Sequence, residues 1–176
     1  SFPDPHHPWD VPRSELHRVN WRDLDLPPAY LDGDEARRVL ATKPKHWLGY
    51  YEASLWSNLE SPRDYVPADM TADQVREINA MTHIENELID EACQRVIDYL
   101  KARDLYDHTD IFFTTDHGEL QGDYGLMFKG PYHVDALMRL PLIWKPGQQG
   151  VEPQVIDDPV GHVDLAPTFC AIAGIE

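Results

Sequence analysis

One feature constrains this chain more than any other: an apolar run that ends abruptly in Asp and His, two residue types that often bind metals. Residues 110–119 read DIFFTTDHGE, with aromatic and β-branched residues before the first Asp-His-Gly. Such a run is typical of a buried strand, and open α/β sheets bind ligands at the carboxyl ends of their strands. We therefore expect residues 110–115 to form an interior strand that presents Asp116 and His117 at the edge of a sheet.

A long helical pattern precedes this run. Apolar residues recur at near-helical spacing over residues 71–103, and Thr71 and Gln74 have the spacing of a capping box. The pattern predicts one long helix packed on the sheet. Residues 35–60 hold two shorter amphipathic pieces divided at Pro44, of which the second is predicted to be helical.

The C-terminal third carries a second strand and a final helix. Residues 140–144 are the predicted strand, and VDLAPTFCAIAGI predicts a helix that Asp164 N-caps and Gly174 ends. Residues 1–35 are rich in proline and predict an irregular segment held by packing. Helix, strand, loop, strand and helix in this order predict a layered α/β fold.

Charge sets outer limits on the partners of this protein. Its 176 residues carry 15 Lys and Arg against 31 Asp and Glu, a formal net charge of −16. This balance disfavours nucleic acid and anionic membrane surfaces, although a bound cation can reverse the field locally and admit an anionic ester. No stretch resembles a signal peptide or a membrane span, so we expect a soluble protein of unknown location.

Each candidate residue also has a simpler explanation. Asp116-His117-Gly118 by itself is a common turn sequence, and Lys129 beside Gly-Pro is an ordinary solvated lysine. His6 fits a packing role in a proline-rich loop. Cys93 and Cys170 lie in apolar patterns typical of buried thiols, and neither has the sequence of a nucleophile.

Longer motifs favour a functional interpretation. TTDHGELQGDYGLMFKGPYHVDALMRLPLIWKPG resembles the sulfatase and phosphonate monoester hydrolase branch of the alkaline phosphatase superfamily, with its Asp-His-Gly-Glu, Lys-Gly and Arg-x-Pro-Leu-Ile motifs. PHHPWDVP resembles the Pro-His-x-Pro segment of that family. VGHVDLAPTFCAIAGI resembles its Val-Ser-x-x-Asp-Leu-x-Pro-Thr helix, with Gly161 in place of serine. The resemblance implies an alkaline-phosphatase-like layered sheet with flanking helices.

The resemblance also implies roles for individual residues. Asp116 and His117 match the ligands of a divalent cation, with Ca²⁺ expected first and Mg²⁺ or Mn²⁺ as alternatives. Instead of binding the metal, His117 can also donate to the oxygen of the nucleophile. Lys129 matches the group that neutralises a sulfate or phosphate oxygen, and His6, rather than its neighbour His7, the one that contacts the leaving oxygen. Four further polar residues are tempting but are left out of this assignment: Glu119, Asp123, His133 and Arg139.

Parts of the family pattern are missing. The paired aspartates and the Cys-x-Pro-x-Arg or Ser-x-Pro-x-Arg motif, whose Cys or Ser becomes the formylglycine nucleophile, do not occur in this sequence. We therefore expect residues 1–176 to be a partial sulfatase-like catalytic domain, without the nucleophile part and the C-terminal subdomain, and inactive alone.

Two functional classes stay open. The first is a hydrolase of sulfate monoesters, or alternatively of phosphonates or phosphodiesters. The second is a non-catalytic α/β module that forms homo-oligomers through surface that a missing part would cover.

Overall fold

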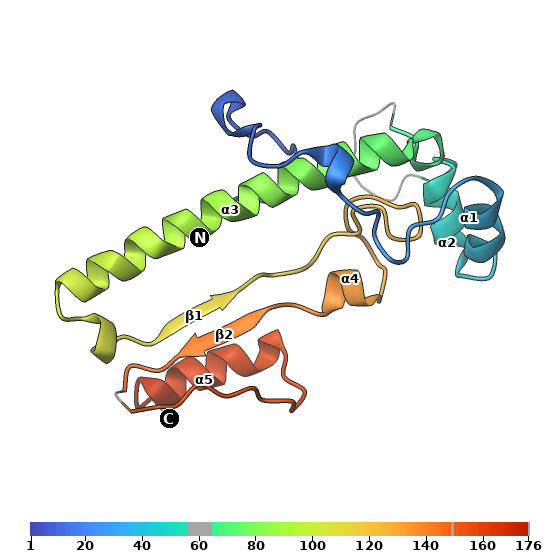
Figure 1. Ribbon diagram of the computed structural model, residues 1–176. Helices are drawn as coiled ribbons and strands as arrows, with labels where there is room; N and C mark the ends of the chain where they lie inside the picture. The colour runs from blue at the N-terminus through green and yellow to red at the C-terminus, as the bar shows by residue number, and fades with distance from the viewer. Residues whose placement is uncertain (56–64, 149, 176) are drawn as a thin grey trace.

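The computed structural model describes residues 1–55, 65–148 and 150–175. A long helix runs above a small sheet, another helix lies below that sheet, and two short helices gather at the opposite end of the molecule (Figure 1). In chain order the elements are η1 (Arg13–Glu15), η2 (Trp21–Asp23), α1 (Gly33–Leu40), α2 (Lys45–Tyr51), η3 (Pro67–Asp69), α3 (Ala72–Ala102), η4 (Tyr106–His108), β1 (Ile111–Thr114), α4 (Asp135–Met138), β2 (Leu142–Lys145), η5 (His162–Asp164) and α5 (Leu165–Ile172). This mixture of helices and strands confirms the predicted α/β class.

The long helix α3 begins and ends as predicted. The backbone N–H of Thr71 donates to Oε1 of Gln74 at 2.9 Å, and the backbone N–H of Gln74 donates to Oγ1 of Thr71 at 3.2 Å. These bonds form the capping box and satisfy two amides that the first turn leaves without helical partners. Between the described elements, the main contacts of α3 are with η2 and η4. The prediction that this helix packs on the sheet is therefore wrong, since neither strand is among its main partners.

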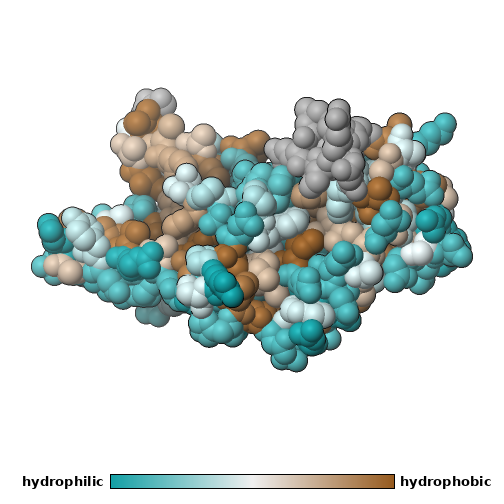
Figure 2. Space-filling model, turned by 90° about the horizontal axis from the view of Figure 1, so that it is seen from above, coloured by the Kyte–Doolittle hydropathy of each residue, from teal (hydrophilic) through white to brown (hydrophobic). Residues whose placement is uncertain are grey.

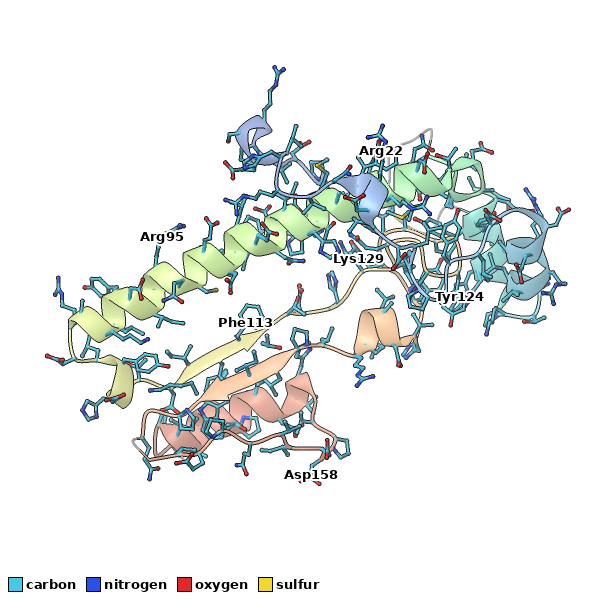
Figure 3. All side chains as sticks on the ribbon, in the orientation of Figure 1. Arg22, Arg95, Phe113, Tyr124, Lys129 and Asp158 are labelled. Carbon is cyan, nitrogen blue, oxygen red and sulfur yellow. The ribbon has the colours of Figure 1, made fainter. Side chains whose placement is uncertain are left out.

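The sheet has two strands among the described residues. β1 and β2 pair antiparallel, with Ile111 opposite Lys145 and Thr114 opposite Leu142. Because β1 pairs with β2 alone within the described ranges, it is an edge strand, and the prediction of an interior strand is wrong for this chain. Phe113 is 42% exposed and its ring projects from β1 toward the region between the sheet and α3 (Figure 3).

Aromatic contacts join the sheet to α5. Phe112 stacks on its cross-strand partner Trp144 with ring centroids 5.2 Å apart, and it meets Phe169 of α5 edge-on at 4.9 Å. Stacked and edge-on pairs of this kind add to the stabilisation from buried area. β2 begins at Leu142, two residues later than predicted, because Pro141 has no N–H to donate within a ladder.

The ends of α5 agree only in part with expectation. Gly174 has a φ of +68° and follows the last helical turn, so the predicted stop is confirmed. Asp164 stands at the N-cap position, but its carboxylate accepts from the N–H of Gly161 at 2.8 Å rather than from an amide of α5. Cys93 is half-buried and Cys170 is exposed, so the expectation of a buried thiol is wrong for Cys170.

The main core lies where α1 and α2 meet the loop between β1 and β2. The predicted helix after Pro44 is confirmed as α2, although residues 56–60 of that segment lie outside the described residues. Its aromatic residues pack with buried residues of the loop. The members of this core are Ala36, Leu40, Trp47, Tyr50, Tyr51, Leu120, Leu126, Met127, Phe128, Tyr132 and Leu137. The loop that carries Lys129 is thus part of the core, which fixes its backbone.

Candidate active site

Asp116 lies just beyond the end of β1. Its side chain is 85% exposed, and its Oδ1 accepts from the backbone N–H of His117 at 3.0 Å. Slight desolvation raises the pKa of Asp116, but His117, the backbone amides of both residues and the Thr115 hydroxyl together hold it below its ordinary value. The carboxylate is therefore ionised and open to solvent at neutral pH, as a ligand for a hard cation must be.

His117 is held in a single tautomer by its own turn. Its Nδ1 lies 2.9 Å from the carbonyl oxygen of Gly118, and a carbonyl only accepts hydrogen bonds, so Nδ1 carries the proton. In the neutral ring the lone pair is then on Nε2, which lies 3.7 Å from Oδ2 of Asp116. Metal-binding histidines commonly donate their other nitrogen to a carbonyl in this way.

Gly118 explains why the motif needs glycine. Its N–H donates to the carbonyl of Leu137 at 3.1 Å, which brings the Asp-His-Gly turn against α4. A Cβ added to Gly118 would lie 1.8 Å from the carbonyl oxygen of Ala136. Only glycine permits this approach, so the turn is anchored to α4 through its backbone.

Lys129 and His6 come together from distant parts of the chain. Nζ of Lys129 lies 2.7 Å from Nε2 of His6, across a sequence separation of 123 residues. Nδ1 of His6 lies 2.7 Å from the carbonyl oxygen of His7 and therefore carries a proton. Nε2 of His6 is then the basic nitrogen and accepts from the Lys129 ammonium, so the proline-rich segment and the Lys-Gly loop meet at one point.

The backbone before Lys129 is strained and tightly packed. Phe128 has a φ of +62°, in the left-handed region that bulky residues avoid, and is 4% exposed. It stacks on Trp9 at 5.4 Å and meets Tyr65 edge-on at 5.3 Å. The hydroxyl of Tyr50 donates to the carbonyl of Met127 at 3.2 Å. Such strain, of about 1–3 kcal/mol, persists only where the surrounding structure holds it. The packing around Phe128 therefore fixes the backbone that leads into Lys129.

The four polar residues that were left out of the assignment differ from Asp116 and His117 in their burial and surroundings. Both carboxylate oxygens of Glu119 are buried. Burial raises the pKa of Asp123, against a backbone hydrogen bond with Ala29 that lowers it. His133 and Arg139 are exposed around α4.

His162 is a contact that sequence reasoning missed. Its Nε2 lies 2.8 Å from the carbonyl oxygen of Thr115, the residue before Asp116. The only sequence signal was its place in VGHVDLAPT, a segment whose resemblance to a family motif gave no role to this histidine.

The metal-binding types of side chain at this site fit a cation only in part. In the part of the chain that the structure describes, no group of three or more His, Cys, Asp and Glu side chains converges on a common point. Asp116 and His117 offer a carboxylate oxygen and an imidazole nitrogen, whereas Ca²⁺ takes six to eight oxygen ligands and Mg²⁺ six. The pair is thus suited to share a cation with other groups.

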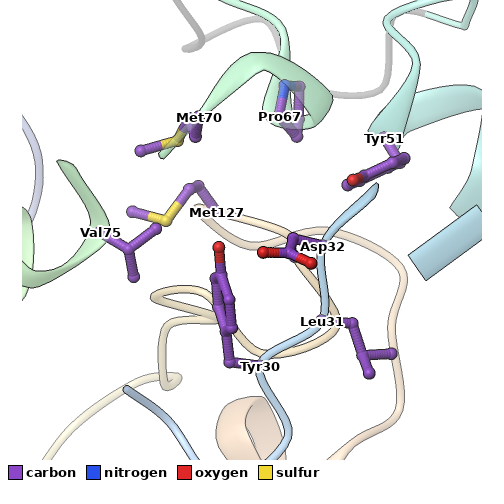
Figure 4. Close-up of a pocket in the computed structure, with 9 residues that line it drawn as sticks. Tyr30, Leu31, Asp32, Tyr51, Pro67, Met70, Val75 and Met127 are labelled. Atoms are coloured by element: carbon purple, nitrogen blue, oxygen red, sulfur yellow. The ribbon is translucent and has the colours of Figure 1, made fainter. Parts of the chain in front are cut away.

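Two hollows elsewhere do not suit an ester substrate. A cavity of about 10 Å³ has the hydroxyl of Tyr30 and the carboxylate of Asp32 pointing into it, with Met127 and Val75 beside them (Figure 4). It has room for about one water molecule. An open groove of about 450 Å³ beside Arg18 is lined by Glu87, Asp90 and Glu91 of α3 and would repel an anion.

Comparison with known proteins identifies the fold and the family of this chain. The phosphonate monoester hydrolase SpPMH of Silicibacter pomeroyi superposes with a TM-score of 0.78 over 98% of this chain and 32% of its own, at 28% identity. The fold is therefore that of the alkaline phosphatase superfamily. The model of the sulfatase family matches residues 52–175, and the chain belongs to that family.

Two relatives show the extent of the match. The uncharacterized sulfatase YidJ of Escherichia coli (strain K12) is 32% identical over 176 residues, which is 100% of this chain and 31% of YidJ. The choline-sulfatase of Rhizobium meliloti (strain 1021) is 31% identical over 113 residues, 64% of this chain and 22% of that enzyme. This chain thus spans about a third, or less, of the length of these relatives. Among its described helices, none has both the length and the apolar character needed to cross a bilayer.

Proposed function

We propose that this chain is the part of a metal-dependent sulfatase that contributes one side of the metal site and the groups that bind the charged and leaving oxygens of a sulfate monoester. The observation that carries the proposal is the 2.7 Å contact between Lys129 and His6, which family motifs far apart in the sequence supply. This contact is not expected if Lys129 is simply a solvated lysine and His6 simply packs in a loop.

Asp116 and His117 would hold the cation, with Ca²⁺ expected first and Mg²⁺ or Mn²⁺ as alternatives. A bound divalent cation supplies Lewis-acid polarisation of the ester and stabilises the oxyanion of the nucleophile. The exposed carboxylate of Asp116 and the Nε2 lone pair of His117 are the atoms available for it. The remaining ligands would come from parts of the sulfatase domain that this chain lacks.

Lys129 and His6 would act on the ester itself. The ammonium of Lys129 neutralises a non-bridging oxygen, where negative charge is concentrated in the transition state. His6 is oriented by the bond from its Nδ1 to the carbonyl of His7, which leaves Nε2 facing Lys129. When the ester takes over the ammonium, Nε2 of His6 is free to take up a proton from solvent, and the imidazolium then donates that proton to the departing oxygen.

We propose that the chain alone is inactive and forms a partial catalytic domain. Neither cysteine is followed by x-Pro-x-Arg and no serine begins Ser-x-Pro-x-Arg, so no residue of this sequence matches the formylglycine nucleophile. The share of the relatives that the chain spans, 31% for YidJ, supports the same conclusion.

Hydrolysis of phosphonate monoesters is the alternative within the same superfamily. The superposition on SpPMH, with a TM-score of 0.78 over 98% of this chain, favours it. Lys129 and His6 suit a phosphonate as well as a sulfate, since both present charged non-bridging oxygens.

Turnover by a longer protein that contains this chain tests the proposal. We expect hydrolysis of p-nitrophenyl sulfate to exceed that of phenyl phosphonate monoesters, and Lys129→Ala and His6→Ala each to lower turnover by about one hundredfold or more. Lys45→Ala, which removes an exposed lysine from α2, is the control. Full activity in both active-site variants would reject these roles, and faster phosphonate turnover would favour the alternative.

A further inference from the structure

We propose that His162 is a positioning residue that fixes the turn bearing Asp116 and His117. The inference rests on the proposed metal site and adds to it a residue from the C-terminal segment. The side chain of His162 contacts the backbone of this turn, so its effect on a cation is indirect.

The contact acts on the peptide unit directly before Asp116. The carbonyl of Thr115 can only accept, so Nε2 of His162 donates to it at 2.8 Å across 47 residues of sequence. Because the peptide group is planar, holding that carbonyl also fixes the orientation of the N–H and the position of the Cα of Asp116. This bond exists both in the neutral tautomer with a proton on Nε2 and in the charged ring.

The turn is anchored on both sides of the two ligand residues. On one side His162 holds Thr115, and on the other the N–H of Gly118 donates to the carbonyl of Leu137 at 3.1 Å. Between these anchors the hydroxyl of Thr115 donates to the carbonyl of His117 at 3.1 Å. Removing His162 would leave the turn with its own internal bonds and the single backbone bond to Leu137.

His162 is itself held in the closed turn η5, which directly precedes α5. The N–H of Gly161 donates to the carboxylate of Asp164 at 2.8 Å, and the N–H of Asp164 donates to the carbonyl of Gly161 at 3.0 Å. The helix that follows packs Phe169 against Phe112 of β1. β1, which leads to Asp116, therefore also packs against α5, the helix that directly follows the turn bearing His162.

The size of this effect permits a clean test. His162 is exposed, and a single hydrogen bond of this kind contributes little to the stability of the whole protein. Its loss leaves the protein folded, whereas partners that orient metal ligands typically change metal affinity by 10–100-fold.

Binding of Mn²⁺ to the 176-residue chain is the experiment, followed by paramagnetic broadening of the amide NMR signals of Asp116 and His117. We expect His162→Ala to weaken Mn²⁺ binding about tenfold. His162→Gln, whose side-chain amide restores a donor, should recover most of this loss. The control is His17→Ala, which removes an exposed histidine that bonds to the carbonyl of Ser14 at 2.6 Å.

The outcomes separate the inference from the proposed function. Equal Mn²⁺ affinity in His162→Ala and in the wild type, or no recovery in His162→Gln, overturns the positioning role. If the wild type itself shows no broadening at Asp116 and His117, the metal site is wrong. The metal-free amide shifts of these residues then decide the inference, which requires that His162→Ala moves them and His162→Gln returns them.

Discussion

A buried carboxyl group on α3 should make the stability of this protein depend on pH. Glu85 is 3% exposed, and its Oε2 has no hydrogen-bond partner within the described residues. Burial, with a smaller contribution from the carboxylates of Asp4 and Asp10, raises its pKa from 4.5 to about 7. The folded protein thus keeps this proton to a higher pH than the unfolded chain does.

The sign and size of the effect follow from linkage. Between pH 4.5 and about 7 the unfolded chain releases the proton while the folded protein retains it, so stability falls as pH rises. At about 1.4 kcal/mol per pH unit, this interval corresponds to a loss of up to about 3.5 kcal/mol. Above the folded pKa the loss is complete and stability no longer changes through this group.

Urea unfolding of the wild type and of Glu85→Gln from pH 4 to pH 8 measures this loss. We expect the stability of the variant relative to the wild type to rise with pH by up to about 3.5 kcal/mol, because glutamine has no charge to bury. Glu77→Gln, an exposed glutamate on the same helix, should show no such rise. Equal pH dependence in Glu85→Gln and the wild type would refute the assignment of this buried charge.

Three further predictions concern the fold. Gly118→Ala should destabilise the protein by about 2–3 kcal/mol in urea unfolding, because its Cβ would lie 1.8 Å from the carbonyl oxygen of Ala136, whereas Gly161→Ala has open space and should change stability by less than about 0.5 kcal/mol; equal effects would reject the close approach. Thr71→Ala should cost about 1 kcal/mol through loss of the cap on α3, and an unchanged unfolding midpoint would show that the capping box contributes nothing. Apolar side chains are exposed on β2, on α5 and on the segment between them, and brown patches mark this end of the molecule (upper left in Figure 2). We therefore expect light scattering with size-exclusion chromatography to find self-association. A monomer at all concentrations would contradict this prediction.

Local signals predicted the helices well. The bounds of α3 follow from apolar spacing and from the Thr71–Gln74 capping box, and the end of α5 follows from Gly174. These features depend on residues within a few positions of one another, so a single sequence contains the whole cause. Pairing of strands does not have this property. The apolar content of β1 suits a covered strand, yet among the described residues β1 pairs with β2 alone.

The candidate site was predictable only in part, for a related reason. Asp116 and His117 are adjacent in sequence, so their proximity needed no knowledge of the fold. The contact between Lys129 and His6 joins positions 123 residues apart, and only the resemblance to a family suggested it. His162 went unnoticed because a histidine that donates to a backbone carbonyl depends on tertiary placement and leaves no pattern of spacing.

Calorimetric titration of the 176-residue chain with Ca²⁺, for the wild type and for Asp116→Asn, tests the central claim most directly. If Asp116 and His117 form one side of a shared metal site, the wild type binds with a Kd of about 1 mM or weaker, because most of the ligands that Ca²⁺ requires are absent from this pair. Asp116→Asn then abolishes the binding heat. Tight stoichiometric binding, or weak binding that Asp116→Asn leaves unchanged, would contradict the account.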